Sequence, residues 1–147
     1  MTPASRGAQA SDLCFLDANV LFSAAYRPDT PLRELWNLPN VQLMTSTYAA
    51  VEAQRNLRQN AQRLELQRLL TQMHIVVDDA QHMHPAVDQI ELADKDKPIL
   101  SSALRAGATH LLTGDRKHFG ACYGTRVESV LILRPADYLR SKLSPPE

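Results

Sequence analysis

Short apolar runs separated by longer, partly polar segments set the pattern of this chain. The first run, Leu13 to Leu16, is unbroken and stops at Asp17. An apolar run this short that ends at a polar residue favours a buried strand over a helix. Continuous apolar strands are in turn typical of parallel sheets. Four later runs predict further strands, at residues 41–44, 75–77, 110–112 and 130–133.

The segments between these runs have helical features. Apolar residues recur at helical spacing, Ser46 or Thr47 and Asp96 suit helix starts, and Gly107 suits a helix end. Strands that alternate with helices predict an α/β fold with a mainly parallel sheet of about five strands. We expect a single domain, a loose tail at 1–11 and a frayed end at 144–147. The domain spans 12–143, with helices near 20–25, 31–37, 47–57, 61–73, 85–93, 97–106 and 135–143 and a loop at 113–120.

Composition narrows the classes of function. Hydrophobic residues make up 44% of the chain, enough for a core, and 16 basic residues balance 16 acidic ones. Zero net charge argues against a protein that binds nucleic acid by bulk charge alone. A chain with zero net charge can still have a local basic rim. Cys14 and Cys122 lack metal-ligand spacing, so we interpret them as a buried apolar residue and a loop thiol in a reducing, cytoplasmic setting. We expect neither a signal peptide nor a membrane span, because no apolar run has the required length.

Four carboxylates occupy comparable places on this pattern. Asp17 and Asp115 each follow a strand, Glu52 lies in the helix after the second strand, and Asp96 begins the helix before the fourth. Ligands bind beyond the carboxyl ends of parallel strands, so separate segments can converge there. Crowded carboxylates repel one another, and a cation such as Mg²⁺, which prefers oxygen ligands, would relieve that repulsion and suit phosphodiester hydrolysis. Taken singly, each acid is also explained as a turn, cap or surface residue.

The segments that carry these acids resemble the motifs of PIN-domain nucleases. Leu16 to Ala24 (LDANVLFSA) resembles the opening motif, and Glu52 to Leu57 (EAQRNL) is similar to the helical Glu segment. Asp94 to Leu100 (DKDKPIL) and Leu111 to Asp115 (LLTGD) together resemble the closing acidic pair. The four motifs stand in the family's order and span residues 13–133.

This resemblance implies a three-layer α/β/α sandwich and a Mg²⁺- or Mn²⁺-dependent endoribonuclease. Many members of the family are the toxin half of a bacterial toxin–antitoxin pair, and self-association is common among them. The implied partners are therefore an RNA substrate, a cognate antitoxin protein and a second copy of the chain. The resemblance also implies an acidic catalytic and metal site with two polar residues beside it: Asp17, Glu52, Asp96 and Asp115, with Asn19 and Thr113.

Two positions depart from the family pattern, and one assignment has an alternative. Ala18 stands where Thr or Ser is frequent, and His118 stands where some members have a further acid. Asp96 fits the closing pair better than Asp94 because it directly precedes the Lys-Pro-Ile-Leu helix start, but Asp94 remains an alternative.

Basic residues beside the last acid suggest how a substrate would be held. Arg116 and Lys117 directly follow Asp115, where cations can contact phosphates. Aromatic residues make up only 5% of the chain, so we expect recognition of RNA shape and phosphate, with exposed bases in a loop.

Two rival interpretations use the same sheet edge. In the first, a non-catalytic relative binds RNA or a protein there. In the second, the chain is a phosphatase of the haloacid-dehalogenase kind, which needs a second Asp two residues after the first. Asn19 occupies that position and argues against the phosphatase.

Overall fold

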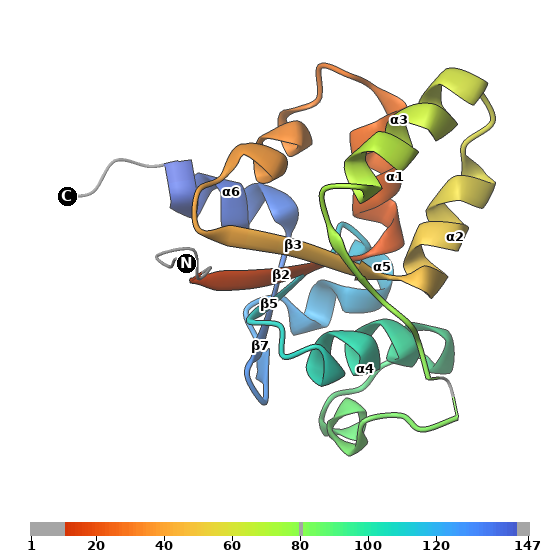
Figure 1. The fold of residues 1–147 in the computed structure, drawn as a ribbon. Coiled ribbons are helices and arrows are strands. Elements are labelled where there is room, and N and C mark those ends of the chain that lie inside the picture. Colours follow the sequence, from red (N-terminus) through yellow and green to blue (C-terminus); the bar gives the residue numbers. More distant parts are fainter. Residues whose placement is uncertain (1–10, 80, 144–147) are drawn as a thin grey trace, which may run out of the picture.

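The computed structural model describes residues 11–79 and 81–143, and its core is one twisted sheet (Figure 1). The six strands have the order β4-β3-β2-β5-β7-β6. Neighbours from β4 to β7 pair in parallel, and β6 pairs antiparallel with β7. The strands are β2 (Asp12–Leu16), β3 (Val41–Ser46), β4 (His74–Val76), β5 (His110–Leu112), β6 (Arg126–Val127) and β7 (Val130–Leu133).

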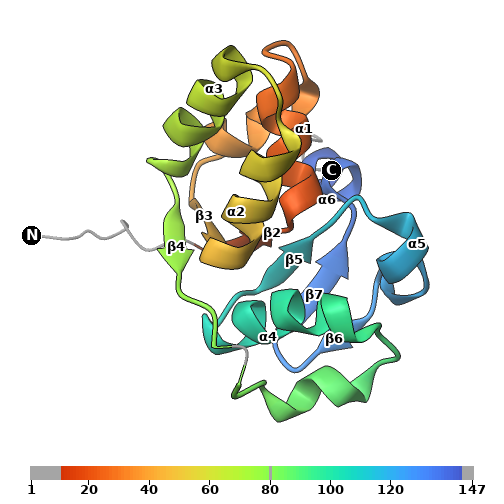
Figure 2. The ribbon, with the colours of Figure 1, turned by 90° about the vertical axis from the view of Figure 1, so that its right-hand side faces the viewer.

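Helices cover both faces of this sheet, which confirms the expected three-layer α/β/α arrangement. Helices α1, α2, α3 and α6 lie on one side, and α4 lies on the other (Figures 1 and 2). The α-helices are α1 (Ala18–Tyr26), α2 (Thr47–Asn56), α3 (Asn60–Leu70), α4 (Lys97–Arg105), α5 (Arg116–Phe119) and α6 (Pro135–Leu143). The 3₁₀ segments are η1 (Pro31–Asn37), η2 (Pro85–Gln89), η3 (Asp94–Asp96) and η4 (Gly120–Cys122).

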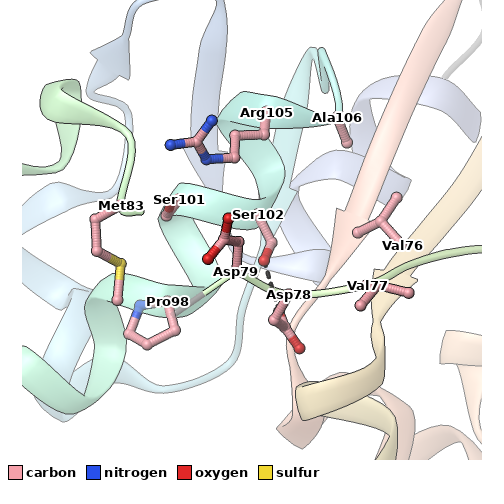
Figure 3. Close-up of a pocket in the computed structure, with 10 residues that line it drawn as sticks. All are labelled: Val76, Val77, Asp78, Asp79, Met83, Pro98, Ser101, Ser102, Arg105 and Ala106. Atoms are coloured by element: carbon pink, nitrogen blue, oxygen red, sulfur yellow. Dashed lines mark hydrogen bonds between the residues drawn. The ribbon is translucent and has the colours of Figure 1, made fainter. Parts of the chain in front are cut away.

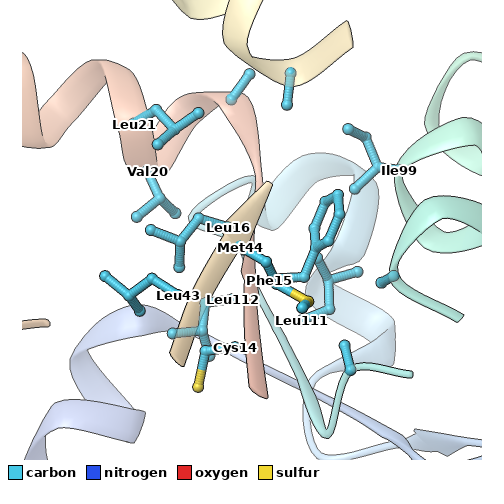
Figure 4. Close-up of a cluster of buried hydrophobic side chains, with 14 of the residues drawn as sticks. Cys14, Phe15, Leu16, Val20, Leu21, Leu43, Met44, Ile99, Leu111 and Leu112 are labelled. Carbon is cyan, nitrogen blue, oxygen red and sulfur yellow. The ribbon is translucent and has the colours of Figure 1, made fainter. Parts of the chain in front are cut away.

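Strand register explains how a continuous apolar run fills two core layers. Cys14 pairs with Leu43 and His110, so these three side chains share the face beneath α1 and α6. Phe15 points to the opposite face, and Ile99 of α4 lies on its side of the strands (Figure 4). Central strands buried on both faces therefore need apolar residues at successive positions, as the sequence has them.

Side-chain caps fix the points where strands turn into helices. Asp17 accepts from the backbone N–H of Ala18 at the start of α1, and Ser46 accepts from that of Ala49 at the start of α2. Such caps satisfy backbone donors that the helix leaves unpaired. The two capping side chains, Asp17 and Ser46, therefore lie at the carboxyl edge of the sheet.

Several sequence-based expectations need correction. The loop expected at 113–120 contains α5, because the Asp115 side chain caps a short helical turn. The helix expected at 85–93 is only the 3₁₀ segment η2. Strand β6 was not expected, since two residues give no readable pattern, and Cys122 is buried rather than a loop thiol.

Some expectations lie beyond what the structure describes. Apart from Ser11, the predicted tails at 1–11 and 144–147 lie outside the described residues. Among the residues that are described, no helix combines the length and apolar character that crossing a bilayer requires.

Candidate functional site

An open cavity of about 490 Å³ lies at the carboxyl edge of the sheet. Its lining includes Asp17 after β2, Glu52 of α2, Asp96 at the start of α4 and Asp115 after β5. The structure therefore brings together the four acids that the sequence pattern placed on one edge. Asp94 is not in this lining: its side chain is 98% exposed and pairs with Lys97. Geometry thus favours Asp96 over Asp94.

Asp17 is the most buried of the acids and the most tightly held. Its Oδ1 accepts from the Ala18 N–H at 2.7 Å, and its Oδ2 accepts from the Thr113 hydroxyl at 2.8 Å and the Asn19 amide at 3.1 Å. Burial raises the pKa of Asp17 to about 6, partly opposed by the hydrogen bond from Thr113, while the charge of Glu52 adds to the rise. A buried carboxylate held in one orientation beside other acids is a ready cation ligand.

Asn19 and Thr113 tie together the two loops that carry these acids. The Asn19 side chain accepts from the Gly114 N–H at 2.7 Å and also donates to the Thr113 hydroxyl at 3.3 Å. That hydroxyl accepts in turn from the Asp115 N–H at 3.1 Å. The buried Thr113 thus links Asp17 to Asp115 through its hydroxyl.

Two acids of the cavity, Asp96 and Asp115, form a group of candidate metal ligands with the neighbouring His118. One ligand atom from each lies within 4.8 Å of the others. The His118 ring nitrogen Nδ1 is 2.5 Å from Asp115 Oδ2 and 3.9 Å from Asp96 Oδ2. His118 was not among the predicted site residues. The sequence did contain a signal for it, because His118 stands where some members of the family have a further acid.

The two acids of this group differ in charge environment. Burial raises the pKa of Asp96, and His118 only partly opposes the rise. Burial would also raise the pKa of Asp115, but hydrogen bonds from His118 outweigh it and lower that pKa below its ordinary value. Within the described chain, the buried Asp96 Oδ2 has no hydrogen-bond partner. Because an orphaned carboxylate oxygen is costly, a bound cation would fit here.

Arg116 and Lys117 lie on α5 next to Asp115, and both are exposed. They are absent from the cavity lining, which instead includes Lys95. The basic rim therefore stands beside the acids rather than among them, and Lys95 is a cation that sequence reasoning did not single out.

A second cavity, of about 110 Å³, lies between the segment after β4 and helix α4 (Figure 3). Asp78 bridges the two sides here: it accepts from the Ser102 hydroxyl at 2.6 Å and from the Tyr48 N–H at 2.6 Å. These bonds satisfy the Asp78 carboxylate within the protein. Because the cavity is small and its carboxylate already has partners, we interpret it as a packing contact between elements rather than a substrate site.

Comparisons with known proteins support the fold. No family model matches the sequence, and no curated protein matches it. The structure is similar to a chain of VapBC2 from Rickettsia felis, solved bound to a DNA fragment from the promoter, with TM-score 0.57 and 14% identity over 83% of this chain and 98% of that one. It is also similar to a chain of VapBC-1 from nontypeable Haemophilus influenzae, with TM-score 0.52 and 14% identity over 84% of this chain and 98% of that one. The PIN-like fold that the sequence motifs implied is thereby confirmed.

Proposed function

We propose that this protein is a divalent-metal-dependent endoribonuclease of the PIN type. The observation that carries the proposal is the convergence of Asp96 and Asp115 within reach of one ion, with a buried Asp96 oxygen that lacks a hydrogen bond. Asp17 and Glu52 line the same cavity and complete an oxygen-rich ligand set. Such a set suits Mg²⁺ or Mn²⁺, which bind through one or a few carboxylates and keep several waters.

The proposed roles follow from where each residue lies. Asp96 and Asp115 would hold the ion directly, Asp17 would hold it or one of its waters, and Glu52 would face it across the cavity. When bound, the ion polarises a phosphoryl oxygen and lowers the pKa of its water. Asn19 and Thr113 keep Asp17 and the Asp115 loop in register. His118 fixes the Asp115 carboxylate and offers a nitrogen to the same group.

The substrate side of the proposal rests on the exposed cations. Arg116, Lys117 and Lys95 stand around the acids and would bind backbone phosphates on either side of the scissile bond. Water would attack phosphorus in line as the P–O3′ bond breaks. The products would carry a 5′-phosphate and a 3′-hydroxyl. A cognate antitoxin and a second copy of this chain, the protein partners that the family resemblance implies, belong to this proposal.

The test is cleavage of a structured RNA by matched variants. Asp115→Asn and Asp96→Asn should each lower the cleavage rate more than about 100-fold, because each removes a charge from the ion's ligands. Asp94→Asn is the matched control, since it makes the same chemical change on an exposed side chain two residues away. It should leave the rate unchanged. EDTA should stop cleavage, and excess Mn²⁺ should restore it.

A non-catalytic binding module is the rival outcome. If the wild-type protein binds RNA with the same affinity in EDTA and in Mn²⁺ but cleaves in neither, the nuclease proposal is wrong. Full activity of Asp115→Asn would refute the assignment of the site while leaving nuclease activity standing.

A further inference from the structure

A second group of metal-ligating side chains lies at the opposite end of strand β2. Asp12, Cys14 and His110 place one ligand atom each within 4.8 Å of one another. Asp12 and Cys14 are two residues apart on β2, and Cys14 pairs with His110 of β5, so all three project from the same face of the sheet. Five residue steps, about 17 Å of extended chain, separate Asp12 from Asp17 of the acidic cavity.

We infer that Asp12, Cys14 and His110 form a binding site for a thiophilic divalent cation of the Zn²⁺ type. The donor set decides the class of ion: one carboxylate oxygen, one sulfur and one imidazole nitrogen suit Zn²⁺ or Co²⁺, whereas Mg²⁺ prefers oxygen alone. Three protein ligands leave a fourth position for water, as in zinc sites that keep an open coordination position. The site is separate from the proposed nuclease centre and does not depend on it.

The distances require only a small contraction. Tetrahedral bonds of about 2.0–2.3 Å separate neighbouring ligand atoms by roughly 3.3–3.8 Å. The present separations of up to 4.8 Å would therefore shorten by at most roughly 1–1.5 Å. Asp12 and His110 are partly exposed while Cys14 is fully buried, so an ion would enter past the carboxylate and the imidazole to reach the sulfur.

His110 has a hydrogen-bond partner of the kind that orients metal-ligating histidines. The Thr109 hydroxyl lies 2.8 Å from His110 Nδ1, accepts from the Leu13 N–H and lies 3.2 Å from the Leu13 carbonyl oxygen. When its proton goes to that carbonyl, Nδ1 donates to Thr109 and the lone pair of Nε2 is free for a metal. A hydrogen bond from the second ring nitrogen to a neighbouring group is the usual way of fixing a ligating tautomer.

Helix α6 supplies the groups that balance the site when no ion is bound. Tyr138 donates to Asp12 Oδ2 at 2.5 Å, and the Lys142 ammonium lies 2.9 Å from the same oxygen. In Figure 1, α6 lies beside the beginning of β2. Lys142 is 37% exposed, so its ammonium can swing into solvent as an ion arrives. On binding, the Cys14 thiol loses its proton to solvent and the sulfur bonds to the metal.

Cobalt spectroscopy tests this site without any reference to RNA cleavage. Co²⁺ titrated into the full chain should produce a thiolate-to-metal charge-transfer band, which the acidic cavity cannot give because it contains no sulfur. Zn²⁺ should abolish the band by displacement. Cys14→Ser should eliminate the band, and His110→Gln should weaken Co²⁺ binding at least about tenfold. Lys142→Met should strengthen binding, because it removes the competing charge.

Cys122→Ser is the matched control, since Cys122 is the other buried cysteine of the chain and has no place in the group. It should keep the band at full intensity. Absence of the band in the wild-type protein would overturn the inference, and so would a band that survives in Cys14→Ser or disappears in Cys122→Ser. The wild-type result alone is decisive even if Cys14→Ser fails to fold, which circular dichroism would reveal.

Discussion

At the scale of single residues, Asp17 illustrates how the candidate site works against stability. The side chain is buried beside Glu52 and Asp115, and its raised pKa shows that its charged form is unfavourable there. Three hydrogen bonds hold it in place but do not remove the cost of burying the charge. In the proposed enzyme a bound cation would offset that cost.

A stability measurement follows from this raised pKa. The unfolded carboxyl titrates near pH 3.9 and the folded one near 6. The folded state therefore binds more protons between these values, and stability falls as pH rises through that window. Asp17→Asn carries no such charge and keeps the cap acceptor. In EDTA it should exceed the wild type in unfolding free energy by up to about 2–3 kcal/mol at pH 7, and by much less at pH 4.

Urea denaturation at the two pH values measures this difference. Asp94→Asn is again the control, because its exposed side chain should give no difference at either pH. A variant Asp17→Asn that is less stable than the wild type at pH 7 would contradict this prediction, because the hydrogen bonds of the carboxylate would then outweigh the cost of its burial.

Gly114 tests how finely the acidic loops are aligned. A Cβ at Gly114 would lie 3.2 Å from Asn19 Oδ1, which also accepts the Gly114 N–H. Gly114→Ala should therefore push Asn19 aside by a few tenths of an ångström. We expect the cleavage rate to fall by about 3- to 10-fold, because small misplacements of positioning groups slow catalysis. The melting temperature should change little. Gly120→Ala, whose new Cβ meets only ordinary contacts, should cleave like the wild type.

At the scale of elements, a small ionic group joins three helical segments. Arg33 of η1 donates to the Ala24 carbonyl of α1 and pairs with Glu65 of α3 at 2.6 Å, while Arg68 pairs with Glu65 at 2.5 Å. Burial would raise the pKa of Glu65, but the two arginines outweigh it and lower that pKa. The group therefore helps to hold the α1–α3 layer together where no substrate is proposed to bind.

The lowered pKa of Glu65 fixes the sign of its pH dependence. Its contribution to stability is present above the unfolded pKa, near 4.3, and is lost as pH falls through the lower folded value. Glu65→Gln should cost no more than about 1 kcal/mol at pH 7, since the pair is partly solvated, and should cost less at pH 3. Chemical denaturation of both proteins checks this, with the exposed Glu91→Gln as control. A loss that is the same at both pH values would contradict the ionic explanation.

At the scale of the whole molecule, the sheet was easier to predict than its surroundings. Strands β2, β5 and β7 are buried central strands, so their apolar runs marked them within one residue. The two residues of β6 and the four of α5 are too short to carry a period: pairing with β7 defines β6, and the local cap from Asp115 defines α5. Parallel topology also explains why acids after different strands meet at one edge.

Other features of the site depend on contacts that no local pattern encodes. The bonds from Thr113 to Asp17 join residues 96 positions apart, and His118 approaches Asp96 through a turn that was expected to be a loop. The group of Asp12, Cys14 and His110 was missed for the same reason. Cysteine spacing along the chain is uninformative when the other ligands come from a neighbouring strand.

The central claim is that carboxylates from separate segments share one divalent cation. Crystals soaked in Mn²⁺ test it most directly, because anomalous scattering locates the ion and identifies its ligands. We predict an anomalous peak in the acidic cavity, bonded to Asp96 and Asp115 and within reach of Asp17. A well-occupied soak with no peak in that cavity, or with a peak that contacts none of these acids, would contradict the account.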